Sequence, residues 1–297
     1  MDIAITGSSG FIGTALTKSL QADGHRVIRV VRRPVESGEL AIRWDPDGGT
    51  IDAKGLEGLD GVVHLAGAGI GDKRWNEERK RVILESRTKG TRLLTEALAG
   101  LDAKPPVLVS GSAMGYYGER GDEVCTEETP AGDVFLSEIC VAWEAAAQPA
   151  VDAGIRVPFL RTGIVLDPHG GVLKRLLLLF KAALGGKLGS GRQWWSWISL
   201  DDQIAAMRWL LENDVAGPVN LTAPEPVTNE VFTKALGAAL HRPTFLAVPS
   251  FGPKLLLGSD MAQQLLFISE RVVPAVLERE GFTFTHRTID DALASML

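Results

Sequence analysis

The chain has 297 residues, of which 45% are hydrophobic and 23% charged, so it can bury a large core and is neither disordered nor fibrous. Its 31 basic and 37 acidic residues give a formal net charge of −6, which argues against a nucleic-acid-binding surface. The two cysteines cannot build a disulfide framework, which favours a cytoplasmic location. The five histidines lack metal-ligand spacing, and no apolar run approaches the length of a membrane span. We therefore expect a chain without metal, nucleic-acid or membrane partners.

The first half of the chain alternates short β-rich runs with amphipathic stretches of helical length. Since strands that alternate with helices pair in parallel and are covered on both faces, this order predicts an α/β fold with a Rossmann-like, doubly wound parallel sheet. Gly24 stands where the left-handed residue after the first helix is expected. The expected strands span 3–5, 26–31, 40–44, 62–66, 107–109 and 156–160, and the expected helices span 11–22, 77–98 and 134–152.

After about residue 166 this regular alternation ends. Helices are expected at 173–184, 200–212, 229–240 and 260–267, and a glycine-rich segment, 185–191, precedes a tryptophan cluster. We therefore predict a first domain over residues 1–165 and a smaller, mainly helical second domain over 166–297. The tail after Ser259 is expected to pack over the mouth of the cleft between them.

A glycine-rich segment, Thr6 to Gly13, joins the first strand to the first helix. A pyrophosphate at a helix N-terminus is held by free backbone N–H groups and by the positive end of the helix dipole, and glycines let the backbone approach it. Because this segment follows a strand and opens a helix, it predicts a dinucleotide site rather than an ordinary glycine-rich turn. The residues expected at the cofactor are Gly7, Ser9, Gly10, Phe11, Ile12 and Gly13.

The end of the second strand indicates which dinucleotide binds. An acidic residue there would hydrogen-bond the ribose 2′-hydroxyl of NAD, but this strand ends in Arg32 and Arg33. Two guanidinium groups are suited to grip a 2′-phosphate. The sequence therefore favours NADP(H), with NADPH preferred over NADH; the alternative is two solvated arginines at a strand end.

Several segments resemble the extended short-chain dehydrogenase/reductases, a superfamily that includes NAD-dependent epimerases and dehydratases. The similar segments are the glycine loop at 6–13, Val62 to Gly67, Ser110 to Gly118, Leu160 to Val165 and Trp197 to Asp202. Ser86 with Arg87, and the tail over 271–284, more narrowly resemble an epimerase-like branch whose C-terminal domain has no assigned function. The resemblance implies further cofactor contacts at Leu65, Ala66, Gly67, Arg87 and Thr162.

The sequence departs from this family at the usual acid/base. Family enzymes use a Tyr-x-x-x-Lys pair on the helix after the fifth strand, but here Leu136 and Cys140 occupy those positions. Two explanations stay open. Either Tyr116 or Tyr117 supplies the phenol, with Ser112 holding a substrate oxygen, or the site binds NADP(H) and a ligand without efficient hydride chemistry.

A loop with flexible glycines, a cation and three indoles, residues 189–197, offers a second set of ligand contacts. Arg192 and Trp194 are the residues that we expect on the ligand side. The alternative is that the tryptophans form a core that clamps the second domain to the first.

These observations together predict an NADP(H)-dependent epimerase or reductase in which residues 1–165 bind the dinucleotide and residues 166–297 bind the substrate. We expect hydride transfer to or from a nucleotide sugar or a related small polar molecule. The alternative is an NADP(H)-binding sensor or regulatory protein without efficient catalysis. The oligomeric state is left open between monomer and homodimer.

Overall fold

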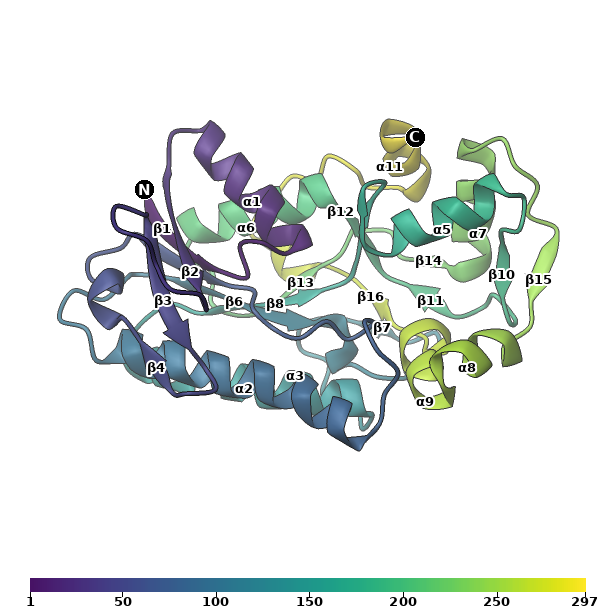
Figure 1. Ribbon diagram of the computed structural model, residues 1–297. Coiled ribbons are helices and arrows are strands. Elements are labelled where there is room, and N and C mark those ends of the chain that lie inside the picture. Colours follow the sequence, from purple (N-terminus) through teal and green to yellow (C-terminus); the bar gives the residue numbers. More distant parts are fainter.

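The computed structural model describes residues 1–297, and its centre is one eight-stranded sheet in the order β13-β8-β6-β5-β1-β2-β3-β4 (Figure 1). All neighbouring strands are parallel except the short β4, which is antiparallel to β3. This confirms the predicted fold class. The strands are β1 (Asp2–Thr6), β2 (Arg26–Val31), β3 (Ala41–Asp45), β4 (Thr50–Ile51), β5 (Gly61–His64), β6 (Leu108–Ala113), β8 (Pro158–Thr162) and β13 (Gly217–Leu221).

Helices cover both faces of the sheet, as parallel crossover connections require (Figure 1). One face carries α1 (Phe11–Ala22), α6 (Leu200–Glu212) and α10 (Ala275–Arg279), and the other carries α2 (Glu77–Ala99), α3 (Phe135–Ala145) and α4 (Gln148–Asp152). The strand order reverses between β1 and β5, so the crevice at their carboxyl ends is where ligands of such sheets bind.

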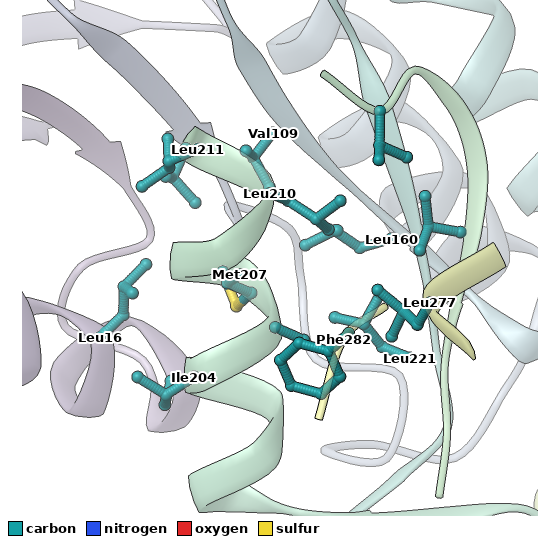
Figure 2. Packing of buried hydrophobic residues seen from close by; sticks show 14 of the residues in the cluster. Leu16, Val109, Leu160, Ile204, Met207, Leu210, Leu211, Leu221, Leu277 and Phe282 are labelled. Atoms are coloured by element: carbon teal, nitrogen blue, oxygen red, sulfur yellow. The ribbon is translucent and has the colours of Figure 1, made fainter. Parts of the chain in front are cut away.

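Neighbouring residues of the central strands enter different cores because a strand has a period of two residues. Ile3 and Ile5 of β1 join the core with α1 and α6, whereas Ala4 joins the core with α2 and α4. Figure 2 shows how Leu16 of α1 and Met207 of α6 face one another in the first of these cores.

A smaller unit of helices and two-stranded ladders follows β8. Its core contains two of the clustered indoles, Trp195 and Trp197, as the core alternative for that cluster predicts. The ladders pair β9 (Ile164–Asp167) with β12 (Trp197–Ser199), β10 (Gly186–Leu188) with β15 (Leu246–Val248), β11 (Trp194–Trp195) with β14 (Val227–Thr228), and β7 (Val124–Cys125) with β16 (Arg271–Val272). The helices of this unit are α5 (Gly171–Lys181), α7 (Asn229–Ala239), α8 (Phe251–Leu257), α9 (Ser259–Ala262) and α11 (Ile289–Met296), with a π-helical turn at Gln263–Phe267. Two 3₁₀ turns, Ala53–Leu56 and Met114–Tyr116, lie earlier in the chain, before β8.

Most predicted elements lie within a few residues of the observed ones, and three differences are informative. The predicted strand 107–109 continues to Ala113, the predicted helix 134–152 breaks before Pro149, and the glycine segment 185–191 contains strand β10. The division predicted at residue 165 stays a prediction, but α6 and β13 follow that point and complete the large sheet and its cover. No helix combines the length and the apolar character that crossing a membrane requires.

Candidate functional site

A cavity of about 910 Å³ lies at the carboxyl ends of β1, β5, β6 and β8. Its walls come from segments far apart in the sequence: the glycine loop, the ends of these strands, α3, α5 and the C-terminal segment 257–270. Met261, Leu266 and Ile268 of that last segment face the cavity, so the tail covers the cleft as predicted. Most of the lining side chains are apolar.

The glycine loop between β1 and α1 is too tightly packed for larger residues. Gly7 has φ +68°, and a Cβ on it would lie 2.9 Å from the carbonyl carbon of Leu65. A Cβ on Gly13 would lie 2.2 Å from the carbonyl oxygen of Gly7. No side chain caps the N-terminus of α1, and its first turn has no acidic residue. The first-turn N–H groups of α1 are therefore free of side-chain caps, which is the arrangement that an anion site at a helix N-terminus needs.

The two arginines that follow β2 differ in their partners. Arg33 forms an exposed ion pair with Glu39, whose pKa it lowers to about 2. Arg32 has only a 3.5 Å contact with the exposed Asp47. A third cation, Arg29, donates a hydrogen bond of 3.1 Å to Ser8 Oγ in the glycine loop. Arg32 and Arg29 are therefore better placed than Arg33 to meet an added phosphate.

A buried hydrogen-bond chain fixes the end of β5 against the glycine loop. His64 Nδ1 lies 2.7 Å from Thr6 Oγ1, and His64 Nε2 lies 2.9 Å from Thr91 Oγ1. Thr6 Oγ1 also accepts hydrogen bonds from the backbone N–H groups of Leu65 and Ala66. Burial lowers the pKa of His64 to about 4, so this histidine is neutral at pH 7.

Arg87 of α2 lies at the wall of the cavity. Its guanidinium donates hydrogen bonds to the carbonyl oxygens of Ala68 and Ile83 and stacks on the Trp143 ring at 4.9 Å. A Cβ on Gly67 would lie 3.3 Å from its guanidinium carbon, so the end of β5 and Arg87 are in contact. Burial lowers the pKa of Arg87 to about 10. This value is still far above 7, so the guanidinium is charged at neutral pH.

Ser112, expected to hold a substrate oxygen, instead takes part in a buried ion pair. Its hydroxyl donates a hydrogen bond of 2.7 Å to Glu144 Oε1. Arg161 of β8 binds both oxygens of Glu144, with Nε to Oε1 at 2.9 Å and Nη2 to Oε2 at 3.0 Å. Burial opposes the charge of Arg161, but the Glu144 carboxylate outweighs it and raises the pKa of Arg161. The three side chains together fix β6, α3 and β8 to one another.

The two candidate tyrosines lie behind this ion pair and do not line the cavity. Tyr117 is fully buried, donates to Asn220 Oδ1 at 2.6 Å and accepts from Arg161 Nη1 at 3.2 Å. Burial raises the pKa of Tyr117 well above its usual range, which makes it a poor base. The Arg161 guanidinium carbon lies 3.4 Å from the centroid of the Tyr116 ring. The geometry thus favours packing over catalysis for both.

Leu136 and Cys140, which stand where family members carry tyrosine and lysine, both line the cavity from α3. Burial raises the pKa of Cys140 to about 12, and its thiol lies 3.5 Å from the Ala113 carbonyl oxygen. The wall that normally supplies the acid/base is therefore apolar here. Thr162, Phe11 and Ile12, predicted at the cofactor, line the same cavity.

The two residues predicted for the ligand side separate in the structure. Trp194 lines the cavity, with its indole N–H donating to Asp122 Oδ1 at 2.7 Å and the Arg271 guanidinium 4.4 Å from its ring. Arg192 is exposed and lies outside the cavity lining.

Sequence reasoning missed four charged groups of the site: Arg29, Glu144, Arg161 and Glu270. The position of Arg29 on the second strand, close to its carboxyl end, could have identified it as a candidate. Arg161 could have been identified too, since a charged residue interrupts the apolar strand β8. Glu270, which lines the cavity at 4% exposure, stands in a segment whose sequence shows no motif.

Comparison with known proteins identifies the relatives of this fold. Residues 3–222 match the NAD dependent epimerase/dehydratase family, and residues 248–296 match DUF1731, a domain of unknown function. These matches confirm the resemblance that the sequence motifs indicate, including the branch with an unassigned C-terminal domain.

Individual relatives cover the whole chain. The chain is 46% identical over 293 residues to the epimerase family protein Mb2239 of Mycobacterium bovis, across 98% of this chain and 96% of the relative. A crystal structure of the human epimerase family protein SDR39U1 (isoform 2) with NADPH has a TM-score of 0.91 at 34% identity, across 100% of this chain and 99% of that chain. A nucleoside-diphosphate sugar epimerase from Corynebacterium glutamicum has a TM-score of 0.81 at 39% identity, across 100% of this chain and 58% of that one.

The human structure contains the cofactor that Arg32 and Arg33 favour for this chain, NADPH. Nearly three quarters of the chain matches one family description, and the similarity to full-length relatives continues to the C-terminus. The protein therefore belongs to the NAD dependent epimerase/dehydratase family.

Proposed function

We propose that this protein is an NADP(H)-dependent oxidoreductase that transfers a hydride between the cofactor and a small substrate held in the cavity. One observation carries the proposal. Phe11 and Ile12, which open the helix after the glycine loop, line the same cavity as Trp194 and Met261 of the C-terminal region. A cofactor on the loop and a substrate under the C-terminal segment would therefore share one enclosure.

The residues present fit NADPH. The glycine loop, whose backbone packs too closely for a Cβ at Gly7 or Gly13, would hold the pyrophosphate through backbone N–H groups of Ser9 and the first turn of α1. Arg32, with Arg29 nearby, would meet the 2′-phosphate. When bound, NADPH supplies a hydride at its nicotinamide ring. The segment Leu65 to Gly67, together with Arg87 and Thr162, would hold the rest of the cofactor.

A second candidate function is a sensor of NADP(H) without efficient turnover. The observation that favours it is the replacement of the family's tyrosine and lysine by Leu136 and Cys140, both of which face the cavity. Such a protein would bind the cofactor and a ligand, and its output would be a change in the C-terminal segment that covers them.

Isotope transfer separates the two candidates. The protein is first titrated with NADPH and with NADH by calorimetry, and we expect tighter binding of NADPH. It is then incubated with NADPH deuterated at the reactive carbon and with a panel of sugar nucleotides, aldehydes and ketones, and the products are examined by mass spectrometry. Deuterium in a product supports the oxidoreductase. Tight NADPH binding with no transfer to any member of the panel contradicts it and supports the sensor.

A further inference from the structure

One carboxyl group of the cavity lining has an oxygen without a hydrogen-bond partner. Glu270 precedes β16, is only 4% exposed and lines the cavity together with Leu136, Cys140 and Trp194. Its Oε1 is buried and accepts no hydrogen bond, and the side chain takes part in no ion pair. The free energy cost of burying an ionised carboxylate in this way is high, whereas a neutral carboxyl is tolerated.

The backbone that carries Glu270 is fixed by hydrogen bonds on both sides. Ser196 Oγ donates a hydrogen bond of 2.7 Å to the Glu270 carbonyl oxygen, and the Val272 N–H donates one of 2.8 Å to Ser196 Oγ. Strand β16 then pairs with β7, which ties the segment to the rest of the molecule. A rigid support of this kind is what a group that acts on a substrate needs.

The groups around Glu270 favour its protonated form. Burial raises the pKa of Glu270 well above its usual range, the negative Glu119 adds to this shift, and the Gly118 amide opposes it. Of the other groups near it, the Cys125 and Cys140 thiols also have raised pKa values because they are buried, and the Arg271 guanidinium stacks on Trp194. These surroundings therefore favour the protonated form of the Glu270 carboxyl.

The cavity needs a proton donor, because α3 presents an aliphatic side chain and an un-ionised thiol where the family's acid/base pair belongs. Resting on the proposed function, we propose that Glu270 is the proton donor of the reduction and gives its carboxyl proton to the oxygen of an aldehyde or ketone bound in the cavity. The substrate class follows from the lining. A carbonyl compound with an apolar body fits the leucine, methionine and indole side chains of the cavity lining.

The step balances in atoms and charge. The carbonyl carbon receives the hydride, and the electron pair of the C=O π bond moves to the oxygen. That oxygen takes the proton from Glu270, which leaves a hydroxyl on the product and a carboxylate on Glu270. A proton from water restores the acid after the product leaves. In the oxidative direction the Glu270 carboxylate accepts the hydroxyl proton.

The chain offers a matched control in Glu127. This carboxyl is also buried, burial raises its pKa, and its Oε2 has no partner. Its Oε1, however, accepts the backbone N–H groups of Asn220 and Val276, and Glu127 does not line the cavity. Glu127→Gln therefore removes a similar acid away from the bound ligand.

The first experiment uses the protein without cofactor. Infrared difference spectra at pH 7 compare the wild type with Glu270→Gln and Glu127→Gln, each with and without benzaldehyde as the carbonyl probe. We expect the wild type and Glu127→Gln to show a protonated-carboxyl band that shifts when benzaldehyde binds, and Glu270→Gln to lack it. A wild-type spectrum without this band, or a band that benzaldehyde leaves unchanged, overturns the proposal.

The second experiment measures reduction of benzaldehyde and phenanthrenequinone by NADPH. Glu270→Gln should lower kcat by about 10²- to 10⁴-fold, the usual contribution of a general acid, while the affinity for NADPH stays within about twofold. The wild-type kcat should fall at high pH as the acid ionises, and this limb should be missing in Glu270→Gln. Glu270→Asp, which keeps a carboxyl, should recover part of the rate, and Glu127→Gln should stay within about threefold of the wild type.

The outcomes separate this proposal from the proposed function. A wild-type rate and pH profile in Glu270→Gln overturns the role of Glu270 and leaves the oxidoreductase standing. A chain that shows the shifting band but never transfers a hydride contradicts the oxidoreductase, and Glu270 is then a ligand-binding acid and no proton donor. Bound NADPH and a native circular dichroism spectrum show that each variant is folded.

Discussion

Two carboxyl groups with little solvent exposure, Glu144 and Glu270, differ in their partners. At the ends of β6 and β8, Glu144 receives two hydrogen bonds from Arg161 and one from Ser112. In the C-terminal segment, Glu270 receives no ion pair, and one of its oxygens is unpartnered. The paired carboxylate joins β6, α3 and β8, whereas burial raises the pKa of Glu270 and favours its protonated form.

The largest expected effect on the free energy of unfolding comes from removing the charge of Glu144, the carboxylate that is paired with Arg161. Glu144→Gln leaves the buried Arg161 charge without its partner, and we expect the free energy of unfolding to fall by about 3–5 kcal/mol. Urea denaturation followed by tryptophan fluorescence measures the change. Glu85→Gln, which removes an exposed partner of Arg81 and Lys89, serves as the control with little effect. A loss below about 1 kcal/mol for Glu144→Gln would show that the pair does not hold β6, α3 and β8 together.

His64 adds a third kind of buried group, which is hydrogen-bonded but uncharged. Its pKa of about 4 in the folded chain lies below the value near 6.5 expected for the unfolded chain. The unfolded chain therefore binds the proton at a higher pH than the folded chain does. The free energy of unfolding has its full value above about pH 6.5 and falls by about 3 kcal/mol as the pH drops to 4. Urea unfolding across this range should show the loss, and His64→Gln should flatten the slope. An equal slope in the variant would assign it to other groups.

A substitution of Tyr117 tests whether its hydroxyl also stabilises the cluster of Ser112, Glu144 and Arg161. Tyr117→Phe removes the hydroxyl between Asn220 and Arg161, so we expect a destabilisation of about 1–3 kcal/mol, with NADPH affinity unchanged. Tyr116→Phe removes a hydroxyl with no protein partner and should change stability very little. If either variant abolished hydride transfer while the fold stayed intact, a phenol and not Glu270 would be the acid.

Glu270→Gln should change stability in the direction opposite to Glu144→Gln. The raised pKa of Glu270 means that the folded chain must keep a proton that the unfolded chain releases above its ordinary carboxyl pKa. The wild type therefore loses stability as the pH rises above that ordinary value, and the glutamine variant does not. Unfolding at pH 5 and pH 7 should show the gap between them widening with pH. Parallel curves would mean that Glu270 is ionised in the folded protein.

The smallest expected effect concerns Arg32 and Arg33, which differ in how strongly they are paired with carboxylates. Arg32→Ala should weaken NADPH binding about tenfold and leave NADH binding unchanged, because it removes a charge-assisted contact to the 2′-phosphate. Arg33→Ala should weaken it less, since Glu39 already holds that side chain. Calorimetric titration with both cofactors checks the order, and a larger loss for Arg33→Ala would reverse the assignment.

Local signals in the sequence predicted the frame of the protein well. The helix at 11–22, the strand at 26–31 and the helix at 200–212 have the observed bounds, because a clear apolar period and a glycine or strand boundary define each of them. The expected helix 134–152 ran through Pro149, whereas the structure ends α3 at Ala145 and places Pro149 in the first turn of α4, where a proline is tolerated. The position of the glycine loop between a strand and a helix was enough to identify it as a candidate dinucleotide site.

The chemistry of the cavity depended on contacts that local patterns do not encode. Ser112 has the hydroxyl expected of a substrate contact, but Glu144, 32 residues away, occupies it. Tyr117 is buried against Asn220, which lies 103 residues further along the chain. Glu270 reaches the cavity only because β16 pairs with β7 and the π-helical turn packs over α3 through the Gln264 contact to Leu136.

The cavity wall formed by residues 257–270 also has a consequence for synthesis on the ribosome. Because residues 6–33 are synthesised before residues 257–270, the growing chain contains the glycine loop and both arginines before it contains the outer wall of the cavity. A fragment that terminates before residue 257 would lack that wall and Glu270.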